Sequence, residues 1–393
     1  MPHQNVKLWS KDLTLIIIVN FLVFVNHLMI LSTFPFYVEQ LGGSEAQAGA
    51  AAALFSVVAV VCRPFIGWAL DNGKRRGLLF AGLCGMALMP IGYMVISAIW
   101  LAFILRMVHG ASLALSNTST STVATDIIPK PRFAEGMGMF GMATALATAC
   151  APALGLAIMD HIGFKALFAA ATASAVISAV LFALVKPTTV QTDKKPLRFG
   201  NMFDKNAVPA SACALIFMLT YGALENFTAK FAADEGLPSG GLFFAVMAVA
   251  LVITRFSAGK VTDKHGERIF VYLCNAAMLA ALLLMGLLPN TFTFFAAAVL
   301  SGFAFGGLEP ALQSMAVSIA PPEKRGSANS TFLCAYDIGI GAGGGIAGML
   351  ITHIGYGKMF AVMAIFNLLS VIVYQLVGKD HPSSFSMRLA ETR

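Results

Sequence analysis

The chain has 393 residues, of which 58% are hydrophobic and only 11% are charged, and its mean hydropathy is +0.79. Soluble proteins carry about 25% charged residues, so the composition excludes a soluble globular class and predicts an integral membrane protein. The formal net charge of +7 does not point to nucleic acid, because the basic residues gather between apolar segments, where they set membrane topology.

The apolar segments are long enough to cross a bilayer, which takes about 20 residues for a helix. Twelve of them follow one another, over residues 12–36, 46–70, 77–97, 99–125, 134–159, 163–185, 207–231, 238–259, 268–288, 291–318, 326–351 and 356–378. The first lacks a small-residue cleavage site and eleven spans follow it, so we do not expect a cleavable signal peptide. The predicted fold class is all-α integral membrane with twelve transmembrane helices.

Lysine and arginine residues predict the orientation of these helices. With the N-terminus in the cytoplasm, 20 of the 26 basic residues fall in cytoplasmic segments. Both termini are therefore expected in the cytoplasm, and the protein is expected in the cytoplasmic (inner) membrane. The cysteines all fall in predicted spans and form no CxxC pair, so neither disulfides nor a metal site are predicted.

One charged pattern occurs twice. "RPFIGWALDNGKRR" begins at Arg63 and "RFSAGKVTDKHGER" begins at Arg255, so the copies lie 255 − 63 = 192 residues apart. Twelve helices with this period give two six-helix halves of the same orientation, which is the parallel pseudo-two-fold arrangement of secondary transporters. The expected parts are a first bundle over 1–186, a polar cytoplasmic linker over 187–206 and a second bundle over 207–393.

Both copies resemble the loop signature of the major facilitator superfamily, Gly-x3-Asp-Arg/Lys-x-Gly-Arg-Arg/Lys. The first copy departs from it at Asn72 and in the position of its glycine, and the second has Glu267 where a basic residue is usual. The resemblance covers essentially the whole chain. It implies a conformational latch that holds the two halves in the outward-facing state, with Asp71, Arg75 and Asp126 as a charge relay. The residues assigned to the latch are Gly67, Asp71, Arg75, Asp126, Gly259, Asp263 and Arg268.

Two further stretches narrow the resemblance. "LRMVHGASLA", with Arg106 and Gly110, is similar to a fourth-helix pattern of proton-coupled members. "GMFGMATALATACAPALG" is similar to the fifth-helix antiporter motif at Gly138, Pro152 and Gly155, with alanine at two positions where glycine is usual. The subgroup that the chain most resembles is therefore the twelve-helix drug:proton antiporters and related bacterial efflux permeases.

Ionisable residues inside predicted spans are costly, at about 2.5–3.5 kcal/mol for a charge at mid-helix, and usually face a cavity or a partner. Glu309 and Asp337 lie near mid-helix and Glu225 lies in the outer third of its span. Burial favours the protonated form of a carboxylate, so these three are the proton-coupling candidates. The alternative is a structural pair with an arginine. The repeat partner of Glu309 is the neutral Asn117, which favours a coupling role over shared architecture.

Other polar residues receive weaker assignments. Arg106 and His109 are expected either to tune proton affinity or to act as structural counter-ions. The predicted substrate cavity contains His27, Asn26, Asn117, Gln313, Tyr221 and Tyr336. The three carboxylates favour a cationic or amphipathic compound, whereas the amide side chains equally suit a sugar, an amino-acid derivative or a metallophore.

The predicted function is a proton-coupled secondary transporter that exports a small organic compound by alternating access. An uptake symporter or facilitator is the alternative, and a non-transporting membrane sensor or scaffold is the third interpretation. An enzyme is not predicted, since the chain has no nucleotide loop and no metal-ligand cluster. The expected partners are a small-molecule substrate, protons and the lipid bilayer, with no cofactor, no metal, no catalytic residue and no nucleic acid. We expect a monomer.

Overall fold

The computed structural model describes residues 7–43, 45–186, 196, 198, 202–238 and 240–379. Its helices are α1 (Lys11–Gln40), α2 (Glu45–Asp71), α3 (Arg75–Val95), α4 (Ile99–Ile127), α5 (Phe133–Ile162), α6 (Phe164–Ala183), α7 (Val208–Asp234), α8 (Gly240–His265), α9 (Arg268–Leu287), α10 (Thr291–Ser318), α11 (Arg325–Met363) and α12 (Ile365–Val373). Twelve helical segments are long and apolar enough to cross a membrane, and no strand occurs among the described residues. The predicted all-α fold class is confirmed. Most of the predicted linker 187–206 lies outside the described residues.

The last two spans are joined end to end. α11 continues to Met363 through a break at Gly355, which has φ 78° and ψ 172°. Two candidate membrane spans cover this region, Pro322–Ile351 and His353–Gly378, and the break lies near the start of the second. They correspond to the predicted spans 326–351 and 356–378. A positive φ is accessible to glycine at little cost, so Gly355 supplies the turn between the eleventh and twelfth spans.

The repeated loops also depend on glycine. Gly73, between α2 and α3, has φ 81°, and Gly266, between α8 and α9, has φ 77°. These glycines are 266 − 73 = 193 residues apart, one more than the 192-residue period of the arginines. The first copy of the motif therefore departs from the family signature by one residue, but its loop still has a glycine in the left-handed conformation that ends the helix.

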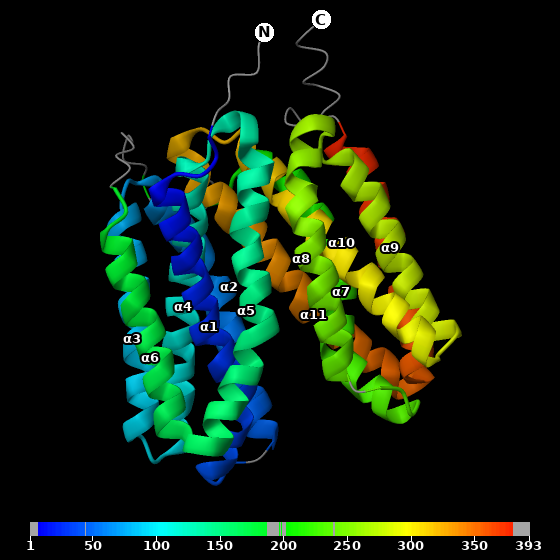
Figure 1. The fold of residues 1–393 in the computed structure, drawn as a ribbon, viewed down its shortest axis with the longest axis horizontal. Coiled ribbons are helices and arrows are strands. Elements are labelled where there is room, and N and C mark those ends of the chain that lie inside the picture. The colour runs from blue at the N-terminus through cyan, green and yellow to red at the C-terminus, as the bar shows by residue number, and fades with distance from the viewer. Residues whose placement is uncertain are drawn as a thin grey trace, which may run out of the picture.

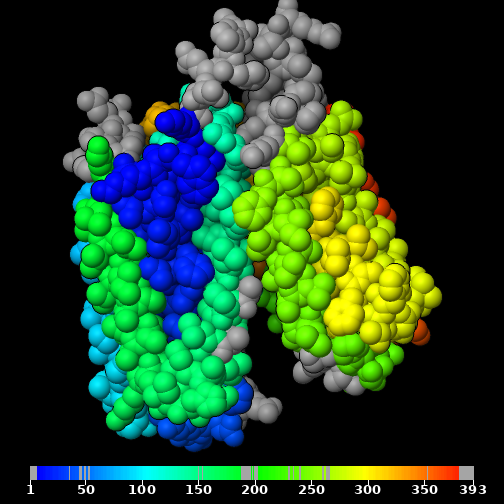
Figure 2. All heavy atoms as spheres, viewed as in Figure 1, coloured from blue at the N-terminus to red at the C-terminus, as the bar shows by residue number. Residues whose placement is uncertain are grey.

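The helices form two groups that stand side by side, α1–α6 and α7–α12 (Figure 1). Between the groups, α5 packs against α8 and α2 packs against α11. The two groups meet toward the end that holds both termini, and a gap opens between them at the opposite end (Figure 2). Large apolar side chains such as Val95, Trp100 and Phe292 are exposed on the outside of the groups, as expected for surfaces in contact with lipid.

Candidate functional site

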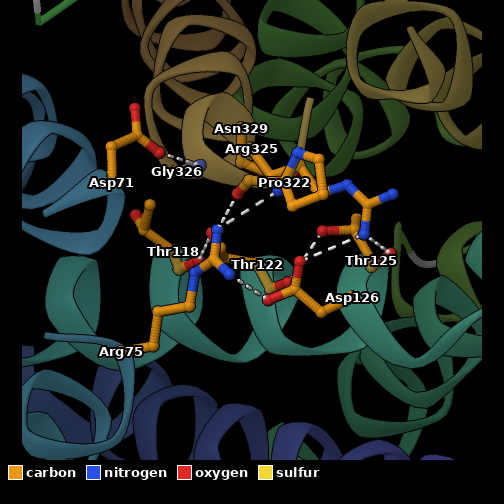
Figure 3. A network of polar contacts seen from close by, with 10 residues as sticks. All are labelled: Asp71, Arg75, Thr118, Thr122, Thr125, Asp126, Pro322, Arg325, Gly326 and Asn329. Carbon is orange, nitrogen blue, oxygen red and sulfur yellow. Dashed lines mark hydrogen bonds and ion pairs between the residues drawn. The ribbon is translucent and has the colours of Figure 1, made fainter. Parts of the chain in front are cut away.

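The end that holds the termini is sealed by polar contacts between the two halves (Figure 3). Asp71, the last residue of α2, accepts hydrogen bonds from the backbone N–H groups of Gly326 at 2.7 Å and Ser327 at 3.0 Å. These N–H groups belong to the first turn of α11, where backbone donors have no partner within the helix. A carboxylate is favoured at such a position by the helix dipole as well.

A second carboxylate completes the seal. Asp126, on α4, lies 2.7 Å from Arg75 and 3.1 Å from Arg325, and its side chain is only 2% exposed. Arg325 also donates to the carbonyl of Thr125 at 2.6 Å, and Arg75 donates to the carbonyl of Pro322. Asp126 of the first half is thus held between one arginine from each half.

The relay implied by the family resemblance is arranged differently here. Arg75 and Asp126 are in contact, but in the described part of the chain Asp71 bonds to α11 instead of forming an ion pair with Arg75. The physical reason is the pair of backbone N–H groups at the start of α11, which bind Asp71, while Arg75 binds Asp126 and the carbonyl of Pro322. Sequence reasoning assigned Arg325 only to membrane orientation. Its position as the first residue after the loop between α10 and α11 was the available signal.

Small residues allow α2 and α11 to approach closely at this seal. A Cβ added to Gly67 would lie 2.6 Å from Cβ of Ser330, and one added to Gly326 would lie 2.7 Å from the carbonyl oxygen of Gly67. Both distances are shorter than a real Cβ contact. The two glycines therefore set the distance between the halves at the sealed end.

The second copy of the motif is placed differently. Gly259 and Asp263 lie on α8, and their side chains are outside the described set. Arg268 begins α9, is exposed, and holds its guanidinium 5.6 Å from the ring centre of Tyr272 on the same helix. Glu267 is buried and accepts a hydrogen bond from the Tyr374 hydroxyl at 2.9 Å. The described contacts of Glu267 and Arg268 thus remain within the second half.

Deeper in the spans, the two repeat-related arginines each hold a carboxylate. Nε and Nη2 of Arg63, on α2, lie 2.8 Å and 2.7 Å from Asp337 on α11, and its Nη1 donates to Thr118 at 3.1 Å. Arg255, on α8, pairs with Glu309 on α10. Both arginines are buried, whereas the side chains of Asp337 and Glu309 are 25% and 17% exposed. The first pair joins the halves, and the second lies within one half.

The third predicted carboxylate lies near two tyrosines. Glu225, on α7, has an exposed side chain. Tyr336 is within electrostatic range of Glu225, Glu309 and Asp337, and the ring of Tyr221 is stacked on Phe305 with 4.3 Å between centroids. The predicted coupling residues and the two cavity tyrosines thus lie in one region. Their positions in the sequence did not predict this proximity.

A neutral polar cluster crosses between the halves near this region. Gln313, on α10, donates to Ser121 at 3.1 Å and to Asn329 at 3.4 Å, and Ser121 donates to Asn329 at 2.9 Å. Asn117 is partly exposed one turn before Ser121 on α4. Asn26 belongs elsewhere: it is buried inside the first half, where it donates to the carbonyls of Met86 and Ala171. The prediction of Asn26 as a cavity residue is therefore not supported by its position.

Arg106, His109 and His27 form a separate cluster inside the first half. Arg106 is fully buried, with its guanidinium 4.5 Å from the ring centre of Phe34 and 4.4 Å from that of Phe55. His27 is stacked on Phe55 at 4.9 Å. In the described residues Arg106 forms no ion pair with a carboxylate. The prediction that it tunes the proton affinity of a coupling carboxylate is therefore not supported by a direct contact.

The fifth-helix motif lies at a close helix contact. A Cβ added to Gly155 would meet the carbonyl oxygen of Met29 on α1 at 2.8 Å, and the two alanines that replace motif glycines, Ala147 and Ala151, are fully buried. Gly138 is buried and Pro152 is partly buried along the same helix. Small residues allow such close packing of membrane helices, so the motif here fixes the α1–α5 contact.

Metal-ligating side chains do not gather in the described part of the chain. No group of three or more His, Cys, Asp or Glu side chains that could hold a metal ion occurs within the described ranges. The six cysteines, Cys62, Cys84, Cys150, Cys213, Cys274 and Cys334, are all free.

Comparison with known proteins gives a consistent result. Residues 16–256 and 210–386 match the sequence model of the Major Facilitator Superfamily. The chain is 23% identical over 372 residues to the uncharacterized MFS-type transporter YhhS of Escherichia coli K12, covering 92% of this chain and 91% of that protein. It is 24% identical over 392 residues to YhhS of Salmonella enteritidis PT4, covering 98% and 96%.

Solved structures show the same fold at lower identity. The human organic anion transporter MFSD10 superposes with a TM-score of 0.78 at 15% identity, covering 92% of this chain and 98% of that one. A bacterial homologue of the iron transporter ferroportin in an outward-facing state gives 0.79 at 14% identity, covering 94% and 100%. The Escherichia coli fucose:proton symporter FucP gives 0.77 at 14% identity, covering 94% and 99%.

Proposed function

Because this chain belongs to the Major Facilitator Superfamily, and is thus a membrane transporter and not an enzyme, we propose that it exports a small organic compound in exchange for protons. The proposed part is the proton coupling, the direction and the substrate class. The observation that carries it is the ion pair between Arg63 on α2 and Asp337 on α11, which joins the two halves within the membrane-spanning region.

This pair must break when the sealed end opens. Arg63 and Asp337 belong to opposite halves, so any movement that separates α2 from α11 leaves both charges without their partner. Separating a buried ion pair is strongly unfavourable, because each charge loses its compensation in a medium of low polarity. A proton on Asp337 removes one of the charges and so lowers the cost. Proton binding then controls the change between states.

Protonation of the second pair, Arg255–Glu309, would also loosen a contact between the halves. Arg255 is held by Glu309, and its Nη1 is pressed against α5: a Cβ added to Gly141 would lie 1.7 Å from that nitrogen. A proton on Glu309 would release Arg255 from its only ion pair among the described residues and loosen the contact between α8 and α5. At both repeat-related arginines, protonation of the paired carboxylate would thus weaken a contact between the two halves.

The exposed carboxylate indicates the substrate class. Glu225 forms no described ion pair, whereas the other two coupling candidates are each neutralised by an arginine. A cationic group on the transported compound would find a partner in Glu225, and the stacked rings of Tyr221 and Phe305 offer a flat apolar surface beside it. This arrangement suits a cationic amphipathic compound.

The proposed export direction builds on the predicted orientation. With both termini in the cytoplasm, the sealed end is cytoplasmic and the gap in Figure 2 faces outward. In that state protons reach Asp337 from outside, the protonated carrier turns inward, and the compound leaves on the return step. The close α1–α5 contact at the antiporter-like motif supports the same direction.

Everted membrane vesicles test this proposal. A proton gradient is imposed, a panel of lipophilic cations, neutral sugars and organic acids is added, and internal pH is followed with a fluorescent dye. Export in exchange for protons predicts that at least one compound dissipates the gradient in wild type and not in Asp337→Asn. Proton movement only in right-side-out vesicles, in the same direction as the compound, would indicate uptake by symport. No proton movement with any compound would show that transport is not coupled to protons. Either of these two results would overturn the proposal.

A further inference from the structure

Among the residues that the structure describes, Arg106 is a buried cation without a counter-charge. It is 0% exposed, and its Nε and Nη1 atoms have no hydrogen-bond partner in the described ranges. Its described polar neighbour is the hydroxyl of Tyr93, which accepts a hydrogen bond from it. A buried charge is expensive unless it is paired. The two phenylalanine rings offset part of this cost, since a cation on an aromatic face is attracted to the ring, but they provide no negative charge.

Two histidines with free nitrogens lie in the same cluster. Nδ1 of His27 and Nε2 of His109 are buried and have no hydrogen-bond partner in the part of the chain that the structure describes, and both residues interact electrostatically with Arg106. Nδ1 of His109 lies 3.3 Å from the Tyr93 hydroxyl. Four polar nitrogens from α1 and α4 are thus left unsatisfied in one place, although buried polar groups in folded proteins nearly always have partners.

The internal repeat shows that the fold does not need this cluster. At the positions 192 residues later, Ala298 replaces Arg106, Leu219 replaces His27 and Ser301 replaces His109. The first two are buried apolar residues of the second half. The same helix packing is therefore filled largely by hydrocarbon in one half and by a cationic cluster in the other, which points to a ligand and not to architecture.

The geometry selects the kind of ligand. Phe34 and Phe55 cover the guanidinium of Arg106, so a ligand must approach the in-plane N–H groups at its edge. Arginine offers these donors in a planar fork that suits a carboxylate, and a halide can accept from the same groups. The charged or chargeable side chains of the cluster are all basic, so a cation is disfavoured.

We propose that Arg106, His27 and His109 form a binding site for a small monovalent anion, supplied either as the carboxylate group of an organic acid or as a halide. The site lies on α1 and α4 of the first half and shares no residue with the Arg63–Asp337 and Arg255–Glu309 pairs. It does not depend on proton coupling or on the direction of transport, so its test is separate from the test of the proposed function.

Thermal unfolding of the purified full chain in detergent provides that test, with a thiol-reactive dye reporting exposure of the buried cysteines. Sodium chloride, sodium bromide, sodium acetate and sodium benzoate are each exchanged against sodium gluconate at constant ionic strength. A ligand that binds only the folded protein raises the midpoint in a saturable way. The control is Arg132→Gln, which removes a surface ion pair between Arg132 and Glu135. We expect the rise in the unfolding midpoint to saturate in wild type and in this control, and we expect no saturable rise in Arg106→Gln.

Saturation by halides alone assigns the site to an inorganic anion, and saturation by acetate or benzoate with competition from chloride assigns it to an organic acid group. If Arg106→Gln does not fold, Arg106→Lys and His109→Asn are titrated instead, with an expected loss of affinity of tenfold or more. An unsaturable wild-type response, or equal saturation in wild type and in every folded cluster variant, would overturn the proposal.

Discussion

Asp71 and Gly326 meet across the two halves: the carboxylate at the end of α2 accepts a hydrogen bond of 2.7 Å from the backbone N–H at the start of α11. The same carboxylate also accepts a hydrogen bond from the backbone N–H of Ser327. Hydrogen bonds to charged groups contribute about 1.5–3 kcal/mol, and about 1.4 kcal/mol corresponds to a factor of about ten in an equilibrium. This contact exists only while the end with the termini is sealed.

We therefore expect Asp71→Asn to shift the population about tenfold or more away from the sealed state. Distances between spin labels on α2 and α11 would measure the shift, and Asp160→Asn, an exposed carboxylate near the end of α5, serves as the control. Ligand binding at equilibrium should be largely retained, because Asp71 lies outside the predicted cavity. An unchanged distance distribution would show that Asp71 does not hold the seal.

A glycine substitution tests the seal without altering charge. A Cβ on Gly67 would lie 2.6 Å from Cβ of Ser330, whereas a Cβ on Gly77 would have no atom within 4 Å. Both glycines are helical, and alanine is favoured over glycine in a helix by about 0.8–1.0 kcal/mol. Gly67→Ala should keep α2 and α11 apart and favour the open state, while Gly77→Ala should leave the distribution unchanged. Labelling of a cysteine introduced at Ser330 reports the difference, and equal labelling rates in the two variants would contradict the close approach.

The predicted orientation can be checked on the linker. Single cysteines at positions 188–200, most of which lie outside the described residues, should react with an impermeant maleimide only from the cytoplasmic side. The physical reason is the concentration of basic residues in the segments assigned to the cytoplasm. A cysteine at Lys165, in the first turn of α6, is the control for the opposite side of the membrane. Labelling of the linker from outside would reverse the orientation and, with it, the export direction.

The sequence was most informative where chemistry is local. Spans, repeat and superfamily could be predicted because apolar runs of about 20 residues are typical of membrane-spanning helices, and a repeated loop with Gly67 and Asp71 is typical of a two-fold transporter. Partners across the fold could not be predicted. Glu309 and Asp337 were recognised as costly, but that Arg255 and Arg63 pair with them depends on how α8 meets α10 and how α2 meets α11. Arg106 was expected to tune proton affinity or to act as a structural counter-ion. Its aromatic neighbours Phe34 and Phe55 could not be predicted, because they come from two other helices.

The two arginine–carboxylate pairs differ in a way that separates stability from coupling. Arg63 keeps a hydrogen bond to Thr118 when Asp337 is altered, but Nε and Nη1 of Arg255 already lack partners, so Arg255 depends on Glu309 alone. Removing one partner of a buried ion pair costs about 3–5 kcal/mol. Because both carboxylates are partly exposed, we expect the cost for these two pairs at the lower end of that range. We expect Glu309→Gln to lower the unfolding midpoint clearly more than Asp337→Asn.

Coupling should follow the opposite order, because only Asp337 reaches across the seam. Proton release on addition of a transported compound to purified protein, followed with a pH dye in weak buffer, measures this directly. Asp337→Asn should abolish the release, and Glu309→Gln, in whatever fraction remains folded, should reduce it. Reciprocity requires that a proton which opposes binding of the compound also be displaced by it. If both variants release protons as wild type does, the coupling proton is on neither residue, and Glu225 becomes the carboxylate to substitute next.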